Sequence, residues 1–358
     1  MALDIFNLMS QTKNYELTFY EEPSASLRSI IAINNSVLGP VLATTKIFNF
    51  KDVEKATKTA LRLAYYNTYR AALLRREFGG GSVVLCGDPK KVKNEFYLRA
   101  LGIYIEKLAG KIFVSHSSGL TYEDLRYIER ETEYILGLDE ELIKAGYSPS
   151  ASMAKGIIWG IKAAVKEKMN KDDLSGLTFA VHGVDAVGYN FVMELLKVKD
   201  AQIIITDKVY DRIKSIQDQV PEVIVVKPSE IYKQSCDVFV SFTFDSTLGQ
   251  KEIEQLDTQI LSGSVNALVE TEEHEKMLEE KGILYIPGYI INGGEIIMYD
   301  NELEGRGAEA VESQLQEIYT ITLDLLRKAR ESKTPVNKVA LETAENYIQN
   351  IAAIKQLR

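Results

Sequence analysis

The stretch "LTFAVHGVDAVGYN", residues 177–190, decides the fold class of the second half of the chain. It begins as an apolar run with strand character and then enters a turn at Gly183. A helical pattern follows, and "AQIIITD", residues 201–207, is a second apolar strand that ends at Asp207. A strand, a glycine turn, a helix and a second strand ending in an acid are the layout of a dinucleotide-binding unit.

The glycine pattern of this turn is incomplete. A dinucleotide fingerprint reads G-x-G-x-x-G, in which the second glycine lets the backbone approach the pyrophosphate. The chain keeps Gly183 and Gly188 but has Asp185 at the middle position, while Asp207 suits a ribose-binding acid. Like charges about 4 Å apart repel by about 1 kcal/mol in water, and by more when partly buried. Two interpretations stay open: a weakened NAD site, or a Rossmann-like turn that holds no cofactor.

The rest of the second half continues this rhythm of strands and helices. The alternation predicts right-handed βαβ units around a parallel sheet. "GYSPSAS", residues 146–152, breaks the pattern before it, so we place a Rossmann-like dinucleotide-binding domain at residues 149–330. The further strand candidates are "VIVVKPSEIY", "CDVFVSF", "TQILSGSVNAL" and "GILYIPGYIINGGEI".

The first half predicts a second α/β domain, residues 1–148, which the C-terminal helices 331–358 join. Its long helix runs from Lys51 to Phe78, and Thr121 opens a later helix with a capping-box pattern. Between them, Gly79–Gly81 precede the apolar run "SVVLCG". Because glycines allow tight turns and close approach to a ligand, we interpret them as a loop that presents Ser82.

Composition excludes several classes of protein. The chain has 358 residues, a formal charge of −9 and a pI near 5.2, so an electrostatic nucleic-acid binder is not expected. It has no apolar run of membrane-spanning length and no N-terminal signal pattern, so we predict a cytoplasmic protein without membrane association. Cys86 and Cys236 are the only cysteines, which argues against a disulfide framework and a zinc site, and we predict no metal.

The chain resembles the leucine/phenylalanine/valine branch of the Glu/Leu/Phe/Val amino-acid dehydrogenases along nearly its whole length. The resemblance implies two domains with a catalytic cleft between them, interconversion of L-amino acids and 2-oxo acids with NAD, and a homo-oligomer, either a dimer or an octamer. The matching segments, in chain order, are "IIAINNSVLGPVLATTKIF", "ALRLAYYNTYR", "FGGGSVVLCGDPKKVKNE", "LTYEDLRYIERETEYILG", "GIKAA", "VHGVDAVGYN", "SCDVF", "GSVNAL" and "GILYIPGYIINGGEII".

The resemblance also assigns the catalytic positions, and two of them have lost the group that carries acid–base chemistry. Arg70 stands where the family has a lysine that grips the substrate carboxylate, and arginine preserves that charge. Ser82 stands at the catalytic lysine and Ser117 at the proton-moving aspartate. An unassisted hydroxyl cannot replace a tuned amine or a carboxylate in acid–base catalysis.

Other positions that the family uses can be located in the same way. The resemblance implies substrate contacts at Leu42, Ala43, Gly80 and Asn266, and a place near the nicotinamide for Asn292. The substitutions gather at positions that the resemblance assigns to the cleft, whereas the scaffold segments still match.

A histidine is the one new candidate for acid–base chemistry. His116 is next to Ser117, and an imidazole can act as a general base near neutral pH. The alternative for His116 is a turn residue that faces the cleft or solvent. We interpret His182 as structural and His274 as solvated in a charged helix.

Three functions remain open at this point. The first is a pseudoenzyme that keeps the fold for binding, regulation, scaffolding or a protein partner. The second is an oxidoreductase with an altered mechanism or substrate, and the third is a non-redox enzyme acting on an amino acid or 2-oxo acid. NAD is a candidate cofactor that Asp185 weakens.

Overall fold

The computed structural model describes residues 4–50, 52–115, 119–243, 247–269 and 271–357. The chain divides into two compact units. The first unit comprises Met1–Ala145, Tyr299–Arg306 and Ala344–Arg358, and the second comprises Gly146–Met298 and Gly307–Thr343. The sequence-based prediction placed the boundary at 148/149 and residues 331–358 with the first domain.

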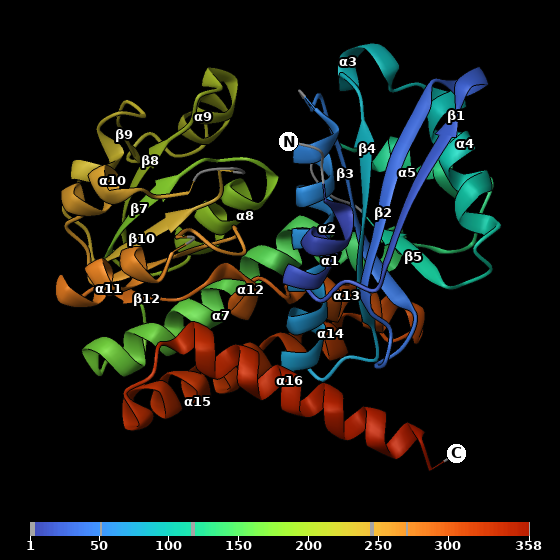
Figure 1. Cartoon of the computed structure of the whole chain (residues 1–358). Helices are drawn as coiled ribbons and strands as arrows, with labels where there is room; N and C mark the ends of the chain where they lie inside the picture. Colours follow the sequence, from blue (N-terminus) through green and yellow to red (C-terminus); the bar gives the residue numbers. More distant parts are fainter. Residues whose placement is uncertain (1–3, 51, 116–118, 244–246, 270, 358) are drawn as a thin grey trace. The chain divides into compact units, whose positions relative to one another are not determined.

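The first unit contains a six-stranded mixed sheet with the order β1-β2-β4-β3-β5-β6 (Figure 1). Strand β2 pairs antiparallel with β1 and β4, whereas β3, β4, β5 and β6 form parallel pairs. The strands are β1 (Glu16–Glu22), β2 (Leu27–Asn35), β3 (Val41–Phe48), β4 (Gly79–Cys86), β5 (Ile112–Ser115) and β6 (Ile135–Leu136).

Helices cover both faces of this sheet. Helix α2 (Val53–Leu73) connects β3 to the parallel strand β4, so β3-α2-β4 is a βαβ unit, and α2 packs on one face. Helices α4 and α5 pack on the other face, around a larger apolar core. The helices of this part of the chain are α1 (Ile5–Gln11), α2, α3 (Pro89–Val92), α4 (Glu95–Glu106), α5 (Tyr122–Glu129) and α6 (Glu140–Lys144).

Gly79–Gly81 are residues of strand β4, so the prediction of a glycine loop is wrong. The physical reason is close packing. A Cβ atom at Gly80 would lie 2.2 Å from the Thr68 backbone nitrogen in α2, and one at Gly81 would lie 2.3 Å from Val41 Cγ1. At Gly80 no side chain fits between helix α2 and strand β4, and at Gly81 the neighbouring strand β3 already fills the space.

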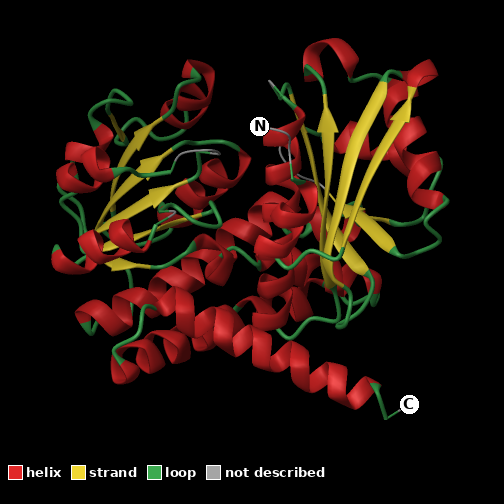
Figure 2. Cartoon of the chain, in the orientation of Figure 1, coloured by secondary structure: helices red, strands yellow, loops and turns green. Residues whose placement is uncertain are grey.

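The second unit contains a six-stranded, fully parallel sheet with the order β12-β11-β10-β7-β8-β9 (Figure 2). Read from the other edge, this is the order of a doubly wound dinucleotide-binding sheet. The prediction of a Rossmann-like α/β fold is confirmed. The strands are β7 (Thr178–His182), β8 (Gln202–Thr206), β9 (Ile224–Val225), β10 (Val238–Ser241), β11 (Ile260–Gly263) and β12 (Leu284–Tyr285).

Helices α7 and α8 pack against each other beside this sheet. The capping box predicted at Thr121 is present, and the helix that it opens, α5, ends at Glu129. Within the described ranges, no helix has the length and apolar character needed to cross a membrane. The remaining helices are α7 (Pro149–Met169), α8 (Ala186–Leu195), α9 (Tyr210–Gln217), α10 (Gln250–Gln255), α11 (Glu272–Glu280), α12 (Gly288–Ile291), α13 (Gly294–Leu303), α14 (Ala308–Leu315), α15 (Glu317–Ser332) and α16 (Val336–Lys355).

The close contact between α2 and β4 predicts a stability effect at Gly80. Gly80→Ala forces a Cβ atom against the backbone of Thr68, and overpacking of this kind costs about 1–3 kcal/mol or more. Gly307→Ala is the control, because a Cβ atom there meets nothing within 4 Å and the backbone has a negative φ. Urea unfolding followed by circular dichroism should show the larger loss of stability for the first variant. The loss for the second should stay below about 1 kcal/mol, because Gly307 is the N-cap of α14 and alanine caps a helix less well than glycine. Equal stabilities of the two variants would contradict this account.

Candidate functional site

Three hydroxyl side chains form a row across the first unit's sheet, on the face that α2 covers. Thr44 on β3 is paired with Ser82 on β4 and with Ser115 on β5. Side chains of directly paired residues point to the same face of a sheet. Asn67 of α2 donates from Nδ2 to Thr44 Oγ1 at 2.8 Å and to the Gly81 carbonyl at 2.7 Å. The row therefore lies against the middle of α2.

The side chain of Ser82 connects strand β4 to helix α2. Its side chain is fully buried, and Oγ donates a hydrogen bond to the carbonyl of Ala60 in α2 at 2.8 Å. A nucleophilic hydroxyl needs a base that accepts its proton, and an amide carbonyl is not such a base. At this position the serine therefore holds a helix to a sheet.

The other predicted substrate residues of the first unit lie around this row, with one exception. Arg70 is buried on α2, one turn after Asn67, and Gly80 is paired with Leu42. Ala43 belongs instead to the apolar core on the opposite face of the sheet, because neighbouring strand residues alternate between faces. His116 and Ser117 lie outside the described residues.

In the second unit, the glycines that remain in the turn are explained by packing. Gly183 has φ +93°, and a Cβ atom on it would lie 2.6 Å from Thr243 Oγ1. A Cβ atom on Gly188 would lie 2.4 Å from the Gly183 carbonyl oxygen. Both positions need glycine whether or not a cofactor binds.

Asp185 caps helix α8. Its Oδ1 accepts hydrogen bonds from the backbone N–H groups of Val187 at 3.1 Å and Gly188 at 3.0 Å. These N–H groups at the start of a helix are the ones that attract a phosphate. Burial raises the pKa of Asp185, and the two N–H groups partly offset that increase. The carboxylate therefore already accepts hydrogen bonds from two of the N–H groups at the start of α8.

Asp207, the predicted ribose acid, is also directed into the turn. Oδ2 accepts the N–H of Val184 at 2.8 Å, and Oδ1 accepts that of Val209 at 2.8 Å. Arg212 lies 3.5 Å from Oδ2, and the Asp207 side chain is only 6% exposed. Both carboxylate oxygens of Asp207 therefore stabilise the turn by accepting hydrogen bonds from its backbone.

Asn266 and Asn292 lie together in the second unit. Asn292 Nδ2 donates to the Ser264 carbonyl at 2.7 Å and to Asn266 Oδ1 at 3.3 Å. Asn292 is buried, and its Oδ1 has no hydrogen-bond partner among the described residues. An unsatisfied buried acceptor suits a donor such as a carboxamide N–H. The carboxamide of a nicotinamide would therefore fit beside Asn292.

His182, at the end of β7, is buried among aromatic and hydroxyl groups. Its Nδ1 lies 3.4 Å from the Tyr232 hydroxyl and 3.5 Å from Ser241 Oγ, and its ring contacts Tyr232 edge-on. Burial lowers the pKa of His182 to about 4. A neutral, packed imidazole agrees with the structural interpretation of this residue.

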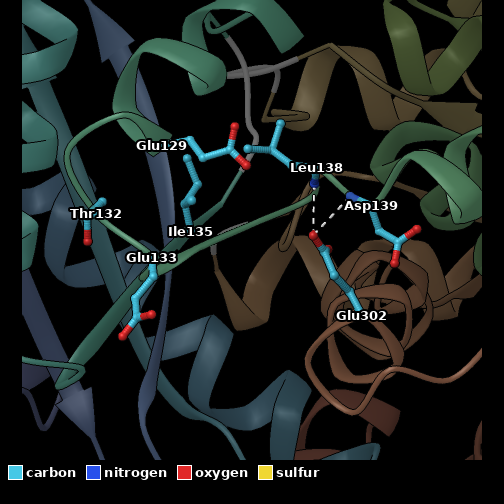
Figure 3. Close-up of a pocket in the computed structure, with 7 residues that line it drawn as sticks. All are labelled: Glu129, Thr132, Glu133, Ile135, Leu138, Asp139 and Glu302. Carbon is cyan, nitrogen blue, oxygen red and sulfur yellow. Dashed lines mark hydrogen bonds between the residues drawn. The ribbon is translucent and has the colours of Figure 1, made fainter.

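A further polar site was missed by the sequence analysis. Glu302 of α13 accepts hydrogen bonds from the backbone N–H groups of Leu138 and Asp139 at 2.9 and 3.1 Å (Figure 3). It also accepts one from the N–H group of Gly137 at 2.6 Å. It borders a cavity of about 430 Å³. Because the carboxylate already fills the ring of N–H groups, Glu302 is an anchor for α13. Among the described residues, no group of His, Cys, Asp and Glu has a metal-binding arrangement. The cavity is lined by Glu129, Thr132, Glu133, Ile135, Leu138, Asp139 and Glu302.

The fold and the two sites define a protein of the two-domain amino-acid dehydrogenase class. Residues 14–138 match the family model for the Glu/Leu/Phe/Val dehydrogenase dimerisation domain. The chain is 33% identical to a leucine dehydrogenase of Bacillus subtilis over 98% of its own length and 95% of the relative's. It is 34% identical to a phenylalanine dehydrogenase of Lysinibacillus sphaericus, over 91% of this chain and 86% of that protein. The chain belongs to the Glu/Leu/Phe/Val dehydrogenase family, in its leucine/phenylalanine branch.

Solved structures agree with this assignment. The L-tryptophan dehydrogenase of Nostoc punctiforme superposes with a TM-score of 0.77 at 30% identity, covering 97% of this chain and 99% of that one. The hetero-hexameric glutamate dehydrogenase of Thermus thermophilus gives 0.76 at 16% identity, covering 93% and 85%. The second likeness shows the fold alone.

The buried imidazole of His182 predicts a pH dependence of stability. In the folded state it stays neutral down to about pH 4, whereas in the unfolded state it takes up a proton below about 6.5. The unfolded state therefore binds more protons between these values, and about 3 kcal/mol of stability is lost as the pH falls from 6.5 to 4. His182→Gln should remove this part of the pH slope in urea unfolding, and His274→Gln, at a partly exposed helix position, should retain it. Parallel slopes for wild type and His182→Gln would contradict the prediction.

Proposed function

We propose that this chain is a pseudoenzyme of the amino-acid dehydrogenase family: it binds an amino acid or 2-oxo acid but does not carry out NAD-dependent oxidative deamination. The observation that carries the proposal is the Asp185 carboxylate, which is bonded to the N–H groups of Val187 and Gly188. A pyrophosphate at the start of α8 would have to displace this cap and approach a carboxylate in a partly buried place, where repulsion is several times stronger than in water.

The first unit supports the same conclusion. Ser82 stands where the family has its catalytic lysine, and its hydroxyl is committed to Ala60. Loss of one electrostatic or acid–base group costs about 10²- to 10⁴-fold in rate. By the same resemblance, Ser117 stands where the family has its proton-moving aspartate. Both substitutions affect one catalytic centre, so their effects on the rate are not simply additive. We expect little or no dehydrogenation of leucine or phenylalanine.

Binding of an acid remains plausible on chemical grounds. Arg70 is buried on α2 beside the polar row, and a guanidinium binds a carboxylate through two parallel hydrogen bonds. The relatives are named for leucine, phenylalanine and tryptophan, so an amino acid or its 2-oxo acid is the ligand class that we propose. We also propose a homo-oligomer, since the matching family model is described as a dimerisation domain, and a cytoplasmic location.

One observation favours a second function, an oxidoreductase with an altered mechanism. The unsatisfied Asn292 Oδ1 would suit the carboxamide of a nicotinamide. The third function, a non-redox enzyme, depends on His116, and turnover without cofactor would reveal it. Both alternatives are tested by the same experiment as the main proposal.

The experiment measures NADH binding through quenching of Trp159, the only tryptophan of the chain, which lies on α7 in the second unit. The wild type should show no saturable binding at millimolar NADH. Asp185→Gly removes both the charge and the cap and should gain at least tenfold in affinity. Asp185→Asn keeps a capping oxygen but loses the charge, so its affinity should lie between the two. Glu279→Gln removes one charge from an exposed site on α11 and should behave as wild type.

The same samples are assayed for reductive amination of a panel of 2-oxo acids. Micromolar NADH binding by the wild type together with a rate typical of the family would overturn the proposed function. Binding without amination would retain the loss of chemistry but reject Asp185 as its cause. Turnover without NADH would identify a non-redox enzyme instead.

A further inference from the structure

Strand β1 forms one edge of the first unit's sheet and is much longer than the other sheet edges (Figure 1). It has seven residues, and among the described residues β2 is the only strand that pairs with it. The strands at the other three edges, β6, β9 and β12, have two residues each. A strand edge presents unpaired N–H and C=O groups, so proteins keep their free edges short or cover them. The length of β1 therefore calls for a partner.

The sequence of β1, ELTFYEE, gives little protection against pairing with another strand. It contains no proline and no lysine, which are the residues that most often block an edge. Glu16 pairs with Lys111 at 2.5 Å and Glu21 pairs with Arg28 at 2.8 Å, so two of its three charges are partly neutralised. None of the seven residues is buried, and Phe19 is 47% exposed. The edge thus offers backbone groups and apolar surface together.

A second copy of β1 is the partner that fits this edge. The family model described as a dimerisation domain matches residues 14–138, and β1 lies inside that segment. Two identical strands related by a two-fold axis pair antiparallel, so every contact is made twice. An axis perpendicular to the sheet keeps the α2 side of both copies on the same face of the joined sheet. The register of the two strands is then the only variable.

Charge disfavours the register that pairs the most residues. With Phe19 opposite its own copy, all seven residues of β1 have a partner, but Glu16 then lies opposite Glu22 at both ends. Like charges directly opposite each other destabilise a sheet. The neighbouring registers, centred on Thr18 or on Tyr20, pair five residues of the strand and bring no two glutamates together.

The apolar side chains favour the register centred on Thr18. In that register Phe19 lies opposite Leu17, and both side chains point to the face that α2 covers, where Leu17 packs against the apolar core. In the register centred on Tyr20, Phe19 lies opposite Glu21 instead. Burial of apolar surface stabilises an interface, whereas burial of a carboxylate without a partner costs free energy.

We propose that β1 is the contact surface between two copies of this chain, and that the two strands pair antiparallel with Thr18 opposite Thr18. The two six-stranded sheets then join into one continuous sheet. The exposed ring of Phe19 is covered by the partner's Leu17, and the partner's Phe19 is covered in the same way. The inference rests on the proposed homo-oligomer, because it names the surface through which that assembly forms.

Sedimentation of the full-length protein tests the surface. The wild type should sediment as a dimer or as a multiple of a dimer. Phe19→Glu places a carboxylate against the partner's Leu17, so it should halve the mass or raise the dissociation constant of the dimer at least tenfold. Phe96→Glu makes the same change at a residue of α4 that is 78% exposed. It is the matched control and should behave as wild type.

Cross-linking tests the register. Oxidation with copper–phenanthroline should join two copies of Thr18→Cys through a disulfide, since the Cβ atoms of directly opposite residues lie about 4.5–5.5 Å apart. Glu21→Cys puts the two thiols about 20 Å apart in this register, so it should not cross-link. Both positions are at least partly exposed, and the fold should tolerate both changes. The wild type, which keeps Cys86 and Cys236, gives the background.

Each contrary result rejects a different part of the inference. A monomeric wild type would reject it together with the proposed homo-oligomer. An assembly that is unchanged in Phe19→Glu, or lost equally in Phe96→Glu, would reject β1 as the surface. Cross-linking of Glu21→Cys but not of Thr18→Cys would reject the register. None of these results depends on NADH, so the proposed loss of dehydrogenation is decided separately by the cofactor and amination assays.

Discussion

The close contact between helix α2 and strand β4 is the constraint on which the first unit's site depends. At Gly80 the helix approaches the strand so closely that a single methyl group would clash with Thr68. This approach brings Asn67 within hydrogen-bonding distance of Thr44 and Gly81 and sets the Ala60 carbonyl over Ser82. The position of Arg70 follows from the same contact, because it lies about one helical turn after Asn67.

The glycine positions of the dinucleotide fingerprint serve two different purposes in the second unit. Gly183 and Gly188 are required by the fold, since a Cβ atom on either would collide with atoms of the same unit. The middle glycine of the fingerprint serves the ligand, because it lets the backbone approach a pyrophosphate. Only that position has changed, to Asp185. The substitution therefore leaves the packing of strand and helix intact and alters the surface that a cofactor would meet.

Much of the fold could be predicted, because alternation of apolar strands and helices is a local pattern. The parallel pairing in the second sheet follows from this alternation of strands and helices. The capping box at Thr121 is also a pattern of neighbouring residues. The predicted glycine loop was wrong because the need for Gly80 arises from Thr68, which reaches it only through the packing of α2. Sequence analysis identified the charge of Asp185 but not its bonds to the helix start. Glu302 could not be found at all, because its partner Gly137 lies 165 residues away.

Two residues that replace family residues, Ser82 and Asp185, both make hydrogen bonds within their own unit. Ser82 bonds to Ala60, and Asp185 bonds to Val187 and Gly188. A catalytic group typically has unsatisfied hydrogen-bonding capacity in the free protein, because that capacity is kept for the substrate. The unsatisfied group lowers the stability of the folded state. When the chemistry is no longer needed, a residue that satisfies itself is favoured, because an unsatisfied buried polar group costs about 1–3 kcal/mol. Ser82 and Asp185 are satisfied in this way, since the hydrogen bonds of both side chains go to the backbone of their own unit.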